Sequence, residues 1–265
     1  MGRVRVAAIS FLNTVPLLRG LLRERPSNLE VNFTLPSECA DQLRQGSAEV
    51  GLIPSIEYLH RSDYRIVPDI AIASDGPVAS VALFSTRPIA AVRTIAVDSS
   101  SRTSVVLLRI LCAQWFDIAP NLITLAPDLA DMVRRCDAAL VIGDPALVAE
   151  HESLGLDKID LGEEWKAMTG LPFVYAFWTG APGVVSRDDV ALLQAARDAG
   201  VEQTETIGME YYKADPERGR LAAAYLRDNI KYRLGERERD GLRTFFKAAA
   251  ELHVVPSGGE LRFYE

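Results

Sequence analysis

The chain has 265 residues, which is enough for one large domain or for two small lobes with separate cores. Hydrophobic residues make up 48% and charged residues 25%, as in ordinary globular proteins, and the formal net charge of -7 argues against a general nucleic-acid binder. The three cysteines, Cys39, Cys112 and Cys136, form no CxxC pair, so neither a disulfide framework nor a cysteine-based metal site is expected.

The first nine residues, Met1–Ile9, read as the start of a buried strand and not as a cleavable leader. Nowhere does the sequence reach the roughly 18 consecutive apolar residues that a membrane span needs. We therefore expect a cytoplasmic protein without a membrane partner.

The first third of the chain alternates short apolar runs with helical patterns, which is typical of an α/β fold. One helix begins at Pro16, and Ser37 can cap another that ends near Gly46. Strands are predicted at Val4–Ile9, Val31–Leu35, Val50–Ile53, Ile66–Ser74 and Val78–Ser85.

A second α/β series begins at Thr94–Val97 and gives way to a helical tail after about Arg187. Long helices are predicted at Asp188–Gly208 and Glu236–Leu252, with a weak pattern at Thr204–Met209 that indicates a break. Between them the predicted elements are a helix from Thr103 to Trp115, a strand at Ile123–Ala126, a helix at Asp128–Arg135, a strand at Ala138–Ile142, a helix at Gly162–Met168 and a strand at Phe173–Trp178.

This order predicts two lobes, of which the first is discontinuous. We expect residues 1–88 and 180–265 to form lobe one and residues 89–179 to form lobe two, with a hinge near 86–90 and 178–182. A short internal echo, Ala48–Pro54 against Asp137–Pro145, supports two related lobes. A cleft beneath such a hinge is a common place for a ligand.

The strongest local signal is the segment Asp98–Ser104, which carries five hydroxyls and one arginine between an apolar strand and an apolar helix. A helix N-terminus presents unpaired N–H groups and a partial positive charge. An ordinary cap needs one Ser or Thr, so the surplus hydroxyls favour an anion site made by Ser101, Thr103 and Ser104. Arg102 either joins that site or points to solvent.

Four more polar side chains follow or begin strands in the first series. Ser10 and Asn13 come after the first strand, where open α/β sheets place ligands, although Asn13 can equally cap the helix that Pro16 enters. Ser55 follows the third strand and is slightly better explained as a helix cap. Ser80 lies early in its strand and can point into the cleft.

In the second series, Gly143 and Asp144 end a strand, and Asp144 can serve as an acid, a base or a helix cap. The segment Gly170–Trp178 reads as a core strand, although an aromatic such as Phe173 can wall a ring-shaped substrate. The three histidines are isolated from all these segments, and no HExxH, GxSxG, GxGxxG or Walker motif is present. Metal, nicotinamide and nucleoside-triphosphate mechanisms are therefore not expected.

Taken together, six segments in this order resemble the chorismate dehydratase family of the futalosine route to menaquinone. The segments are Phe11–Leu17, Gly51–Tyr58, Ser74–Val78, Asp98–Ser104, Asp160–Trp165 and Gly170–Val174. The resemblance implies a two-lobed, periplasmic-binding-protein-like type II fold with a central cleft.

The resemblance also implies an activity: conversion of chorismate, a small dianionic substrate, to 3-[(1-carboxyvinyl)oxy]benzoate and water, with no cofactor. It implies Asn13 and Ser80 as the catalytic residues and, since the matched motifs hold no obvious base, the substrate's enolpyruvyl carboxylate as the base. Two alternatives stay open. One is the 1,4-dihydroxy-6-naphthoate synthase of the same pathway, which relies on a histidine, and the other is a non-catalytic protein that binds small anions.

Overall fold

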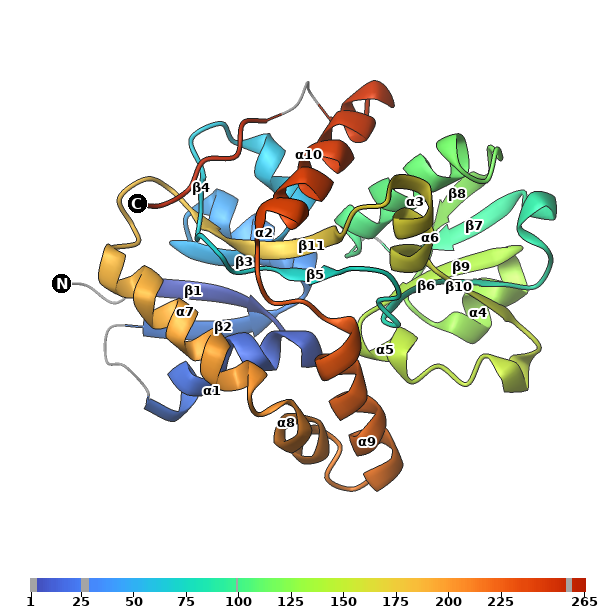
Figure 1. Cartoon of the computed structure of the whole chain (residues 1–265). Coiled ribbons are helices and arrows are strands. Elements are labelled where there is room, and N and C mark those ends of the chain that lie inside the picture. Colours follow the sequence, from blue (N-terminus) through green and yellow to red (C-terminus); the bar gives the residue numbers. More distant parts are fainter. Residues whose placement is uncertain (1–3, 25–28, 99, 256–258) are drawn as a thin grey trace.

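The computed structural model describes residues 4–24, 29–98, 100–255 and 259–265, which form two β-sheets side by side (Figure 1). In spatial order, the first sheet contains β2 (Leu29–Thr34), β1 (Val4–Ile9), β3 (Val50–Pro54), β11 (Phe173–Gly180) and β4 (Arg65–Ile66), with β5 (Ile72–Ser74) also paired to β11. The second sheet contains β10 (Asp157–Asp160), β6 (Val81–Ser85), β9 (Ala138–Ile142), β7 (Thr94–Val97) and β8 (Asn121–Thr124).

Each sheet has a parallel part built from strand–helix–strand units and an antiparallel strand added beside it. In the first sheet β1 is parallel to β2 and β3, and β11 runs antiparallel to β3. In the second sheet β7 is parallel to β8 and β9, and β6 runs antiparallel to β9. The carboxyl ends of the parallel strands thus form one edge in each sheet, and ligands commonly bind at such edges.

Helices cover both faces of the first sheet. The apolar side of α1 (Val15–Glu24) packs beside α7 (Arg187–Val201), and the two helices approach closely because Gly200 has no side chain. A Cβ at that position would lie 1.8 Å from the carbonyl oxygen of Pro16. On the opposite face α2 (Pro36–Gln45) packs over Gly51 and ends at Gly46, whose φ of 73° suits a glycine.

The helices of the second lobe begin at residues that the sequence marks well. Asp128 caps α4 (Leu129–Arg135), and Asp160 caps α6 (Leu161–Thr169), which ends at Gly170 in the left-handed conformation. The remaining two helices are α3 (Arg102–Gln114) and the short α5 (Asp144–Leu147).

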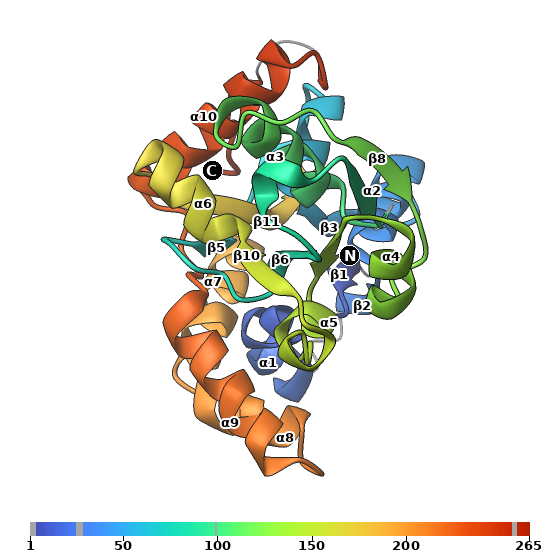
Figure 2. The same cartoon turned by 90° about the vertical axis from the view of Figure 1, so that its right-hand side faces the viewer.

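The C-terminal part returns to the first lobe as helices. In both views α8 (Thr204–Tyr211) and α9 (Pro216–Ala224) form the lower end of the molecule, and α10 (Glu236–Glu251) lies at the upper end, packed on β11 and α3 (Figures 1 and 2). Between α9 and α10 the chain forms one π-helical turn, η5 (Tyr225–Asn229). Short 3-10 turns occur at η1 (Leu12–Thr14), η2 (Ser55–His60), η3 (Ile89–Ala91) and η4 (Glu152–Leu154).

The strands divide between the sheets at other residues than expected. β6 lies in the second sheet and β11 in the first, whereas the expected boundaries near 88 and 180 put them the other way round. The chain order conceals this arrangement because β6 pairs with β9 and β10, which follow it by more than 50 residues and run antiparallel to it. By strand membership the chain crosses between the sheets before β6 and again before β11.

Three local predictions also differ from the structure. The expected strand Ile66–Ser74 is divided into β4 and β5, and the expected helix Asp188–Gly208 ends at Val201, with α8 beginning at Thr204. The residue before α2 is Leu35 and not Ser37, because Pro36 already occupies the first helical position.

Candidate functional site

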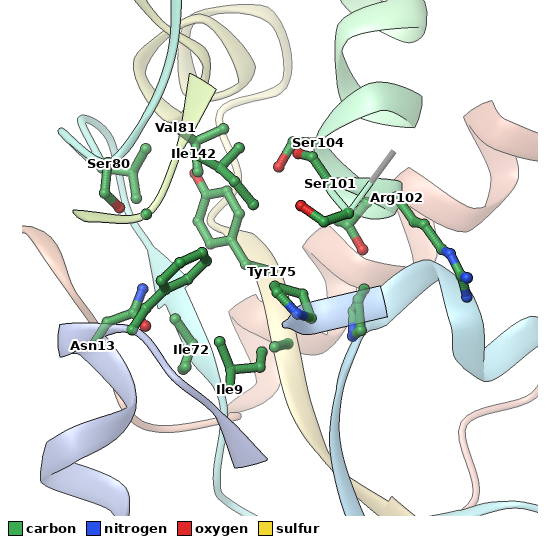
Figure 3. Close-up of a pocket in the computed structure, with 18 residues that line it drawn as sticks. Ile9, Asn13, Ile72, Ser80, Val81, Ser101, Arg102, Ser104, Ile142 and Tyr175 are labelled. Atoms are coloured by element: carbon green, nitrogen blue, oxygen red, sulfur yellow. The ribbon is translucent and has the colours of Figure 1, made fainter. Parts of the chain in front are cut away.

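A cavity lies between the two sheets, with about 530 Å³ of space free of protein atoms when its open mouth is included. Figure 3 shows Ile9 and Asn13 on one side of it and Ser101 and Ser104 on another, with Tyr175 between them. The described residues that line it are Ile9, Phe11, Asn13, Pro36, Pro54, Ile72, Val78, Ser80, Val81, Ser100, Ser101, Arg102, Thr103, Ser104, Ile142, Gly143, Tyr175 and Ala176.

The topology explains why these residues meet. The carboxyl ends of the parallel strands β1, β3, β7 and β9, or the segments that directly follow them, all contribute to the lining. Ser80 precedes β6, which is antiparallel to β9, so the start of β6 lies beside the end of β9. The Gly143 N–H accordingly donates to the carbonyl of Ser80 at 2.7 Å.

The hydroxyl-rich segment forms one wall of the cavity. Ser101, Thr103 and Ser104 are buried at the N-terminus of α3, and Ser101 Oγ has no hydrogen-bond partner within the described part of the chain. Ser100 bonds back to Asp98 through its N–H and its hydroxyl. Ser99, the fifth hydroxyl residue, lies outside the described residues. A buried hydroxyl without a partner beside the open first turn of a helix suits an anionic ligand group.

Arg102 lines the cavity but its charged group faces away from it (Figure 3). The guanidinium forms ion pairs with Asp41 at 3.0 Å and with Glu57 at 3.0 Å. Asp41 lies on α2 and Glu57 on η2, so the pairs join the second lobe to the first. Arg102 therefore acts as an interlobe clamp, and among the described lining residues it is the one with a formal charge.

Asn13 and Ser80 face each other across a third side chain. Asn13 Nδ2 donates to the hydroxyl of Tyr225 at 3.0 Å, and that hydroxyl lies 2.8 Å from Ser80 Oγ. Asn13 Oδ1 is buried and has no hydrogen-bond partner among the described residues. Burial raises the pKa of Tyr225 well above its ordinary value, so this hydroxyl stays protonated. Nothing in the local sequence around Tyr225 indicated it.

The backbone that leads into Ser80 is strained, and two side chains of β10 hold it in place. Ala79 has a φ of 61°, which is unusual for a residue with a side chain. The N–H groups of Val78 and Ala79 donate to the carboxylate of Asp160 at 3.0 and 2.6 Å, and Lys158 Nζ donates to the Ala79 carbonyl at 3.0 Å. Strain of this kind persists only where the surroundings fix it, and it is frequent at functional sites.

Gly143 is required by both its conformation and its neighbour. Its φ is 68°, and a Cβ there would lie 2.7 Å from the ring of Phe11 on the other lobe. The two lobes thus touch at the cavity through a glycine and a phenyl ring.

Asp144 is a predicted site residue that the described lining does not include. Its carboxylate accepts from the N–H of Leu12 at 3.0 Å and from the hydroxyl of Tyr211 at 2.6 Å. Burial raises the pKa of the Asp144 carboxyl, and these two hydrogen bonds oppose the rise. Asp144 therefore joins the second lobe to η1 and α8 as a second interlobe contact.

Ser10, Ser55 and Phe173 also lie outside the described lining. Ser10 is exposed, and Ser55 is buried with its hydroxyl donating to the carbonyl of Val174 at 2.8 Å. Phe173 packs in an aromatic cluster with Trp165 and Phe245. Ser10 thus lies outside this cavity, and Ser55 and Phe173 stabilise the core.

Two aromatic residues are in the described lining of the cavity, Phe11 and Tyr175, and Tyr175 lies two residues beyond the predicted Phe173. β11 has an irregularity in its pairing with β5 between Val174 and Ala176, and such bulges re-aim side chains next to active sites. The Tyr175 hydroxyl lies 3.2 Å from Ser74 Oγ, which fixes the ring.

The described residues show neither a metal-binding cluster nor a membrane-spanning helix. They contain no group of three or more His, Cys, Asp and Glu side chains arranged to hold a metal ion. No helix in the same residues is both long enough and apolar enough to cross a bilayer.

Comparison with known proteins gives the family. The model of a family described as "Menaquinone biosynthesis" matches residues 4–251. The chain belongs to this menaquinone biosynthesis family. The chain is also 29% identical over 259 residues to the chorismate dehydratase of Thermus thermophilus, with 90% of this chain and 92% of the relative covered.

Solved structures at low identity confirm the predicted fold for this family member. A protein of Archaeoglobus fulgidus superposes with a TM-score of 0.77 at 17% identity, covering 96% of this chain and 98% of that one. The alkanesulfonate-binding protein of Xanthomonas axonopodis pv. citri, bound to MOPS, gives 0.70 at 16% identity and covers 97% and 95%. A Candida albicans protein described as having the generic periplasmic-binding-protein fold gives 0.67 at 13% identity and covers 97% and 92%. The chain therefore has the two-lobed periplasmic-binding-protein-like architecture.

Proposed function

We propose that this chain is a chorismate dehydratase, a carbon–oxygen lyase that converts chorismate to 3-[(1-carboxyvinyl)oxy]benzoate and water, with the cytoplasm as its expected compartment. The observation that carries the proposal is that two buried oxygens, Asn13 Oδ1 and Ser101 Oγ, have no hydrogen-bond partner among the described residues and belong to different walls of one cavity. Menaquinone-family membership and the chorismate dehydratase relative support the same substrate.

The cavity suits chorismate because that molecule has an unsaturated ring and two carboxylates. We assign one carboxylate to the N-terminus of α3, where Ser101, Thr103 and Ser104 supply hydroxyls and the first helical turn supplies N–H groups. The ring then packs against the apolar wall formed by residues such as Ile9 and Ile142, with Tyr175 beside it. Asn13 and Ser80 remain for the polar substituents of the ring.

The reaction removes the proton from the ring carbon that bears the enolpyruvyl ether and expels the hydroxyl from the neighbouring carbon. The electrons of the broken C–H bond form the new ring double bond, the hydroxyl leaves with a proton as water, and the ring becomes aromatic. The described lining offers no carboxylate, histidine or lysine as a base. We therefore assign proton removal to the enolpyruvyl carboxylate, with Asn13 and Ser80 orienting the reacting groups and stabilising developing charge.

The two alternatives fit the site less well. A synthase that relies on a histidine would need one at the cavity, and the described lining has none. A protein that only captures an anion has no need for the second polar wall around Asn13 and Ser80.

The test is to incubate the purified protein with chorismate and follow the aromatic product by ultraviolet absorbance and mass spectrometry. We expect turnover by the wild type and a loss of kcat/KM of about 10²- to 10³-fold in Asn13→Ala and in Ser80→Ala, as for removal of one hydrogen-bonding group at a transition state. The exposed residues Asn32 and Ser153 give the matched controls Asn32→Ala and Ser153→Ala. Binding of chorismate without turnover would favour the anion-binding alternative.

A further inference from the structure

Tyr225 lies behind the cavity wall and contacts both proposed catalytic side chains. It begins the π-helical turn η5, it is 2% exposed, and it is absent from the described lining. Its hydroxyl is 3.0 Å from Asn13 Nδ2 and 2.8 Å from Ser80 Oγ. Asn13 and Ser80 are 67 positions apart in the chain, and Tyr225 comes 145 positions after Ser80. The hydroxyl is thus the one described atom that bonds to both side chains.

The chemistry of the three groups fixes the direction of the hydrogen bonds. An amide nitrogen only donates, so the Tyr225 oxygen accepts from Asn13. A tyrosine hydroxyl has one proton, and either hydroxyl of the Tyr225–Ser80 pair can donate; because the Tyr225 oxygen already accepts from Asn13, we assign the Tyr225 proton to Ser80 Oγ. Ser80 then has its own proton free, and Asn13 has its Oδ1 free.

The two groups left for a ligand, one on Asn13 and one on Ser80, have opposite hydrogen-bonding roles. Asn13 Oδ1 is an acceptor without a partner in the described residues, and Ser80 Oγ is left as a donor toward the cavity. Without Tyr225, the amide of Asn13 can rotate by half a turn and the Ser80 hydroxyl can point elsewhere, because no other hydrogen bond within the described part of the chain holds either side-chain group.

We propose that Tyr225 is a positioning residue that holds Asn13 as a hydrogen-bond acceptor and Ser80 as a hydrogen-bond donor toward the substrate. This inference rests on the proposed function for the identity of the substrate. The π-helical turn serves the role because it places Tyr225 at the junction between α9 and the strand-end segments. Tyr225 itself touches no reacting atom.

Tyr225→Phe tests the proposal because it removes one oxygen and keeps the ring. The matched control is Tyr232→Phe, since Tyr232 is also buried and its hydroxyl has no hydrogen-bond partner among the described residues. We expect Tyr225→Phe to lower kcat for chorismate about 10- to 100-fold, less than the loss of a direct donor, with KM changed less than about threefold. Tyr232→Phe should keep kcat near the wild-type value.

A double-mutant cycle separates positioning from a structural role. If Tyr225 acts only through Asn13 and Ser80, adding Tyr225→Phe to the double variant Asn13→Ala/Ser80→Ala should lower kcat by less than about twofold further, whereas independent structural damage would multiply the losses. A Tyr225→Phe protein with wild-type kcat, or with losses that multiply, overturns the proposal.

The outcome also distinguishes this proposal from the proposed function. If wild type and Tyr232→Phe both fail to turn over chorismate, the proposed function is wrong, and the readout becomes chorismate affinity by calorimetric titration. An affinity at least about 10-fold weaker in Tyr225→Phe, unchanged in Tyr232→Phe and not further weakened when Tyr225→Phe is added to Asn13→Ala/Ser80→Ala, then supports the positioning role. Equal affinities overturn it.

Discussion

The two polar walls of the cavity are built in different ways. On one wall, Asn13 and Ser80 are tied to each other through Tyr225, and Ser80 is further held by the Asp160-bound turn at Ala79. On the other wall, Ser101 and its neighbours sit on the first turn of α3 with a hydroxyl left open. A wall whose hydrogen-bond donor and acceptor are fixed suits the chemical step. A wall of donors not paired within the described residues suits the binding of a carboxylate.

The largest expected effect on stability comes from the point where the lobes touch. Gly143→Ala adds a methyl group 2.7 Å from the Phe11 ring and forces a non-glycine residue to a φ of 68°. We expect at least about 2 kcal/mol lower stability and ~10-fold lower kcat/KM, because the two lobes can no longer approach each other as closely. Thermal unfolding and chorismate turnover measure both effects.

Gly155→Ala is the matched control for this substitution. Gly155 has a φ of 64°, but a Cβ there would meet no atom within 4 Å. It should cost only the backbone strain, about 1 kcal/mol, and leave kcat/KM unchanged. Equal effects of the two substitutions would show that the contact between Gly143 and Phe11 is unimportant and that the two lobes need not touch there.

A smaller effect tests whether the α3 wall only binds. Ser101→Ala removes the open hydroxyl, and we expect KM for chorismate to rise about 10-fold with kcat within about threefold, because a hydrogen bond to a charged group is lost in ground and transition state alike. Steady-state kinetics beside Ser80→Ala give the comparison. A fall in kcat as large as that of Ser80→Ala would erase the distinction between the walls.

The smallest effect concerns the contact of Asp144 with Leu12 and Tyr211, outside the described lining. Burial raises the pKa of Asp144, so the folded state binds its proton more tightly, and wild-type stability falls as pH rises from the ordinary value of 3.8 through the raised value. Asp144→Asn lacks this titration and loses one hydrogen bond, about 1 kcal/mol, at low pH.

The melting temperature of Asp144→Asn relative to wild type should therefore increase with pH across that window and level off above it. Its kcat/KM at neutral pH should stay within about threefold of wild type, because the side chain is not part of the described lining. A larger kinetic loss would make Asp144 part of the chemical wall.

Short motifs at strand ends predicted much of the site. Asn13, Ser80, Ser101 and Gly143 all follow or begin strands, and parallel topology brings such positions to one edge, so local sequence was enough to find them. Tyr225 was beyond reach because its role depends on contacts with residues more than 140 positions away.

The remaining wrong predictions concern where a side chain points and which residues it contacts. Regular alternation along a strand gives no sign of the irregularity at Tyr175, so Phe173 was chosen in its place. Arg102 was predicted either to join the anion site or to point to solvent, and Asp144 to act as an acid, a base or a helix cap. The charged group of each instead meets partners from the other lobe, and no local pattern reveals those partners. The lobe boundaries failed for the same reason, because β6 pairs with strands that come later in the chain.

The positions of Arg102 and Asp144 have a consequence for the speed of the enzyme. Substrate and product both carry two carboxylates, so the α3 wall holds them alike and gives the product no reason to leave first. Parting of the lobes breaks the Arg102 ion pairs and the Asp144 hydrogen bonds whichever molecule is inside. If product leaves only after the lobes part, the rate of parting sets a ceiling on turnover, independent of how fast the ring becomes aromatic.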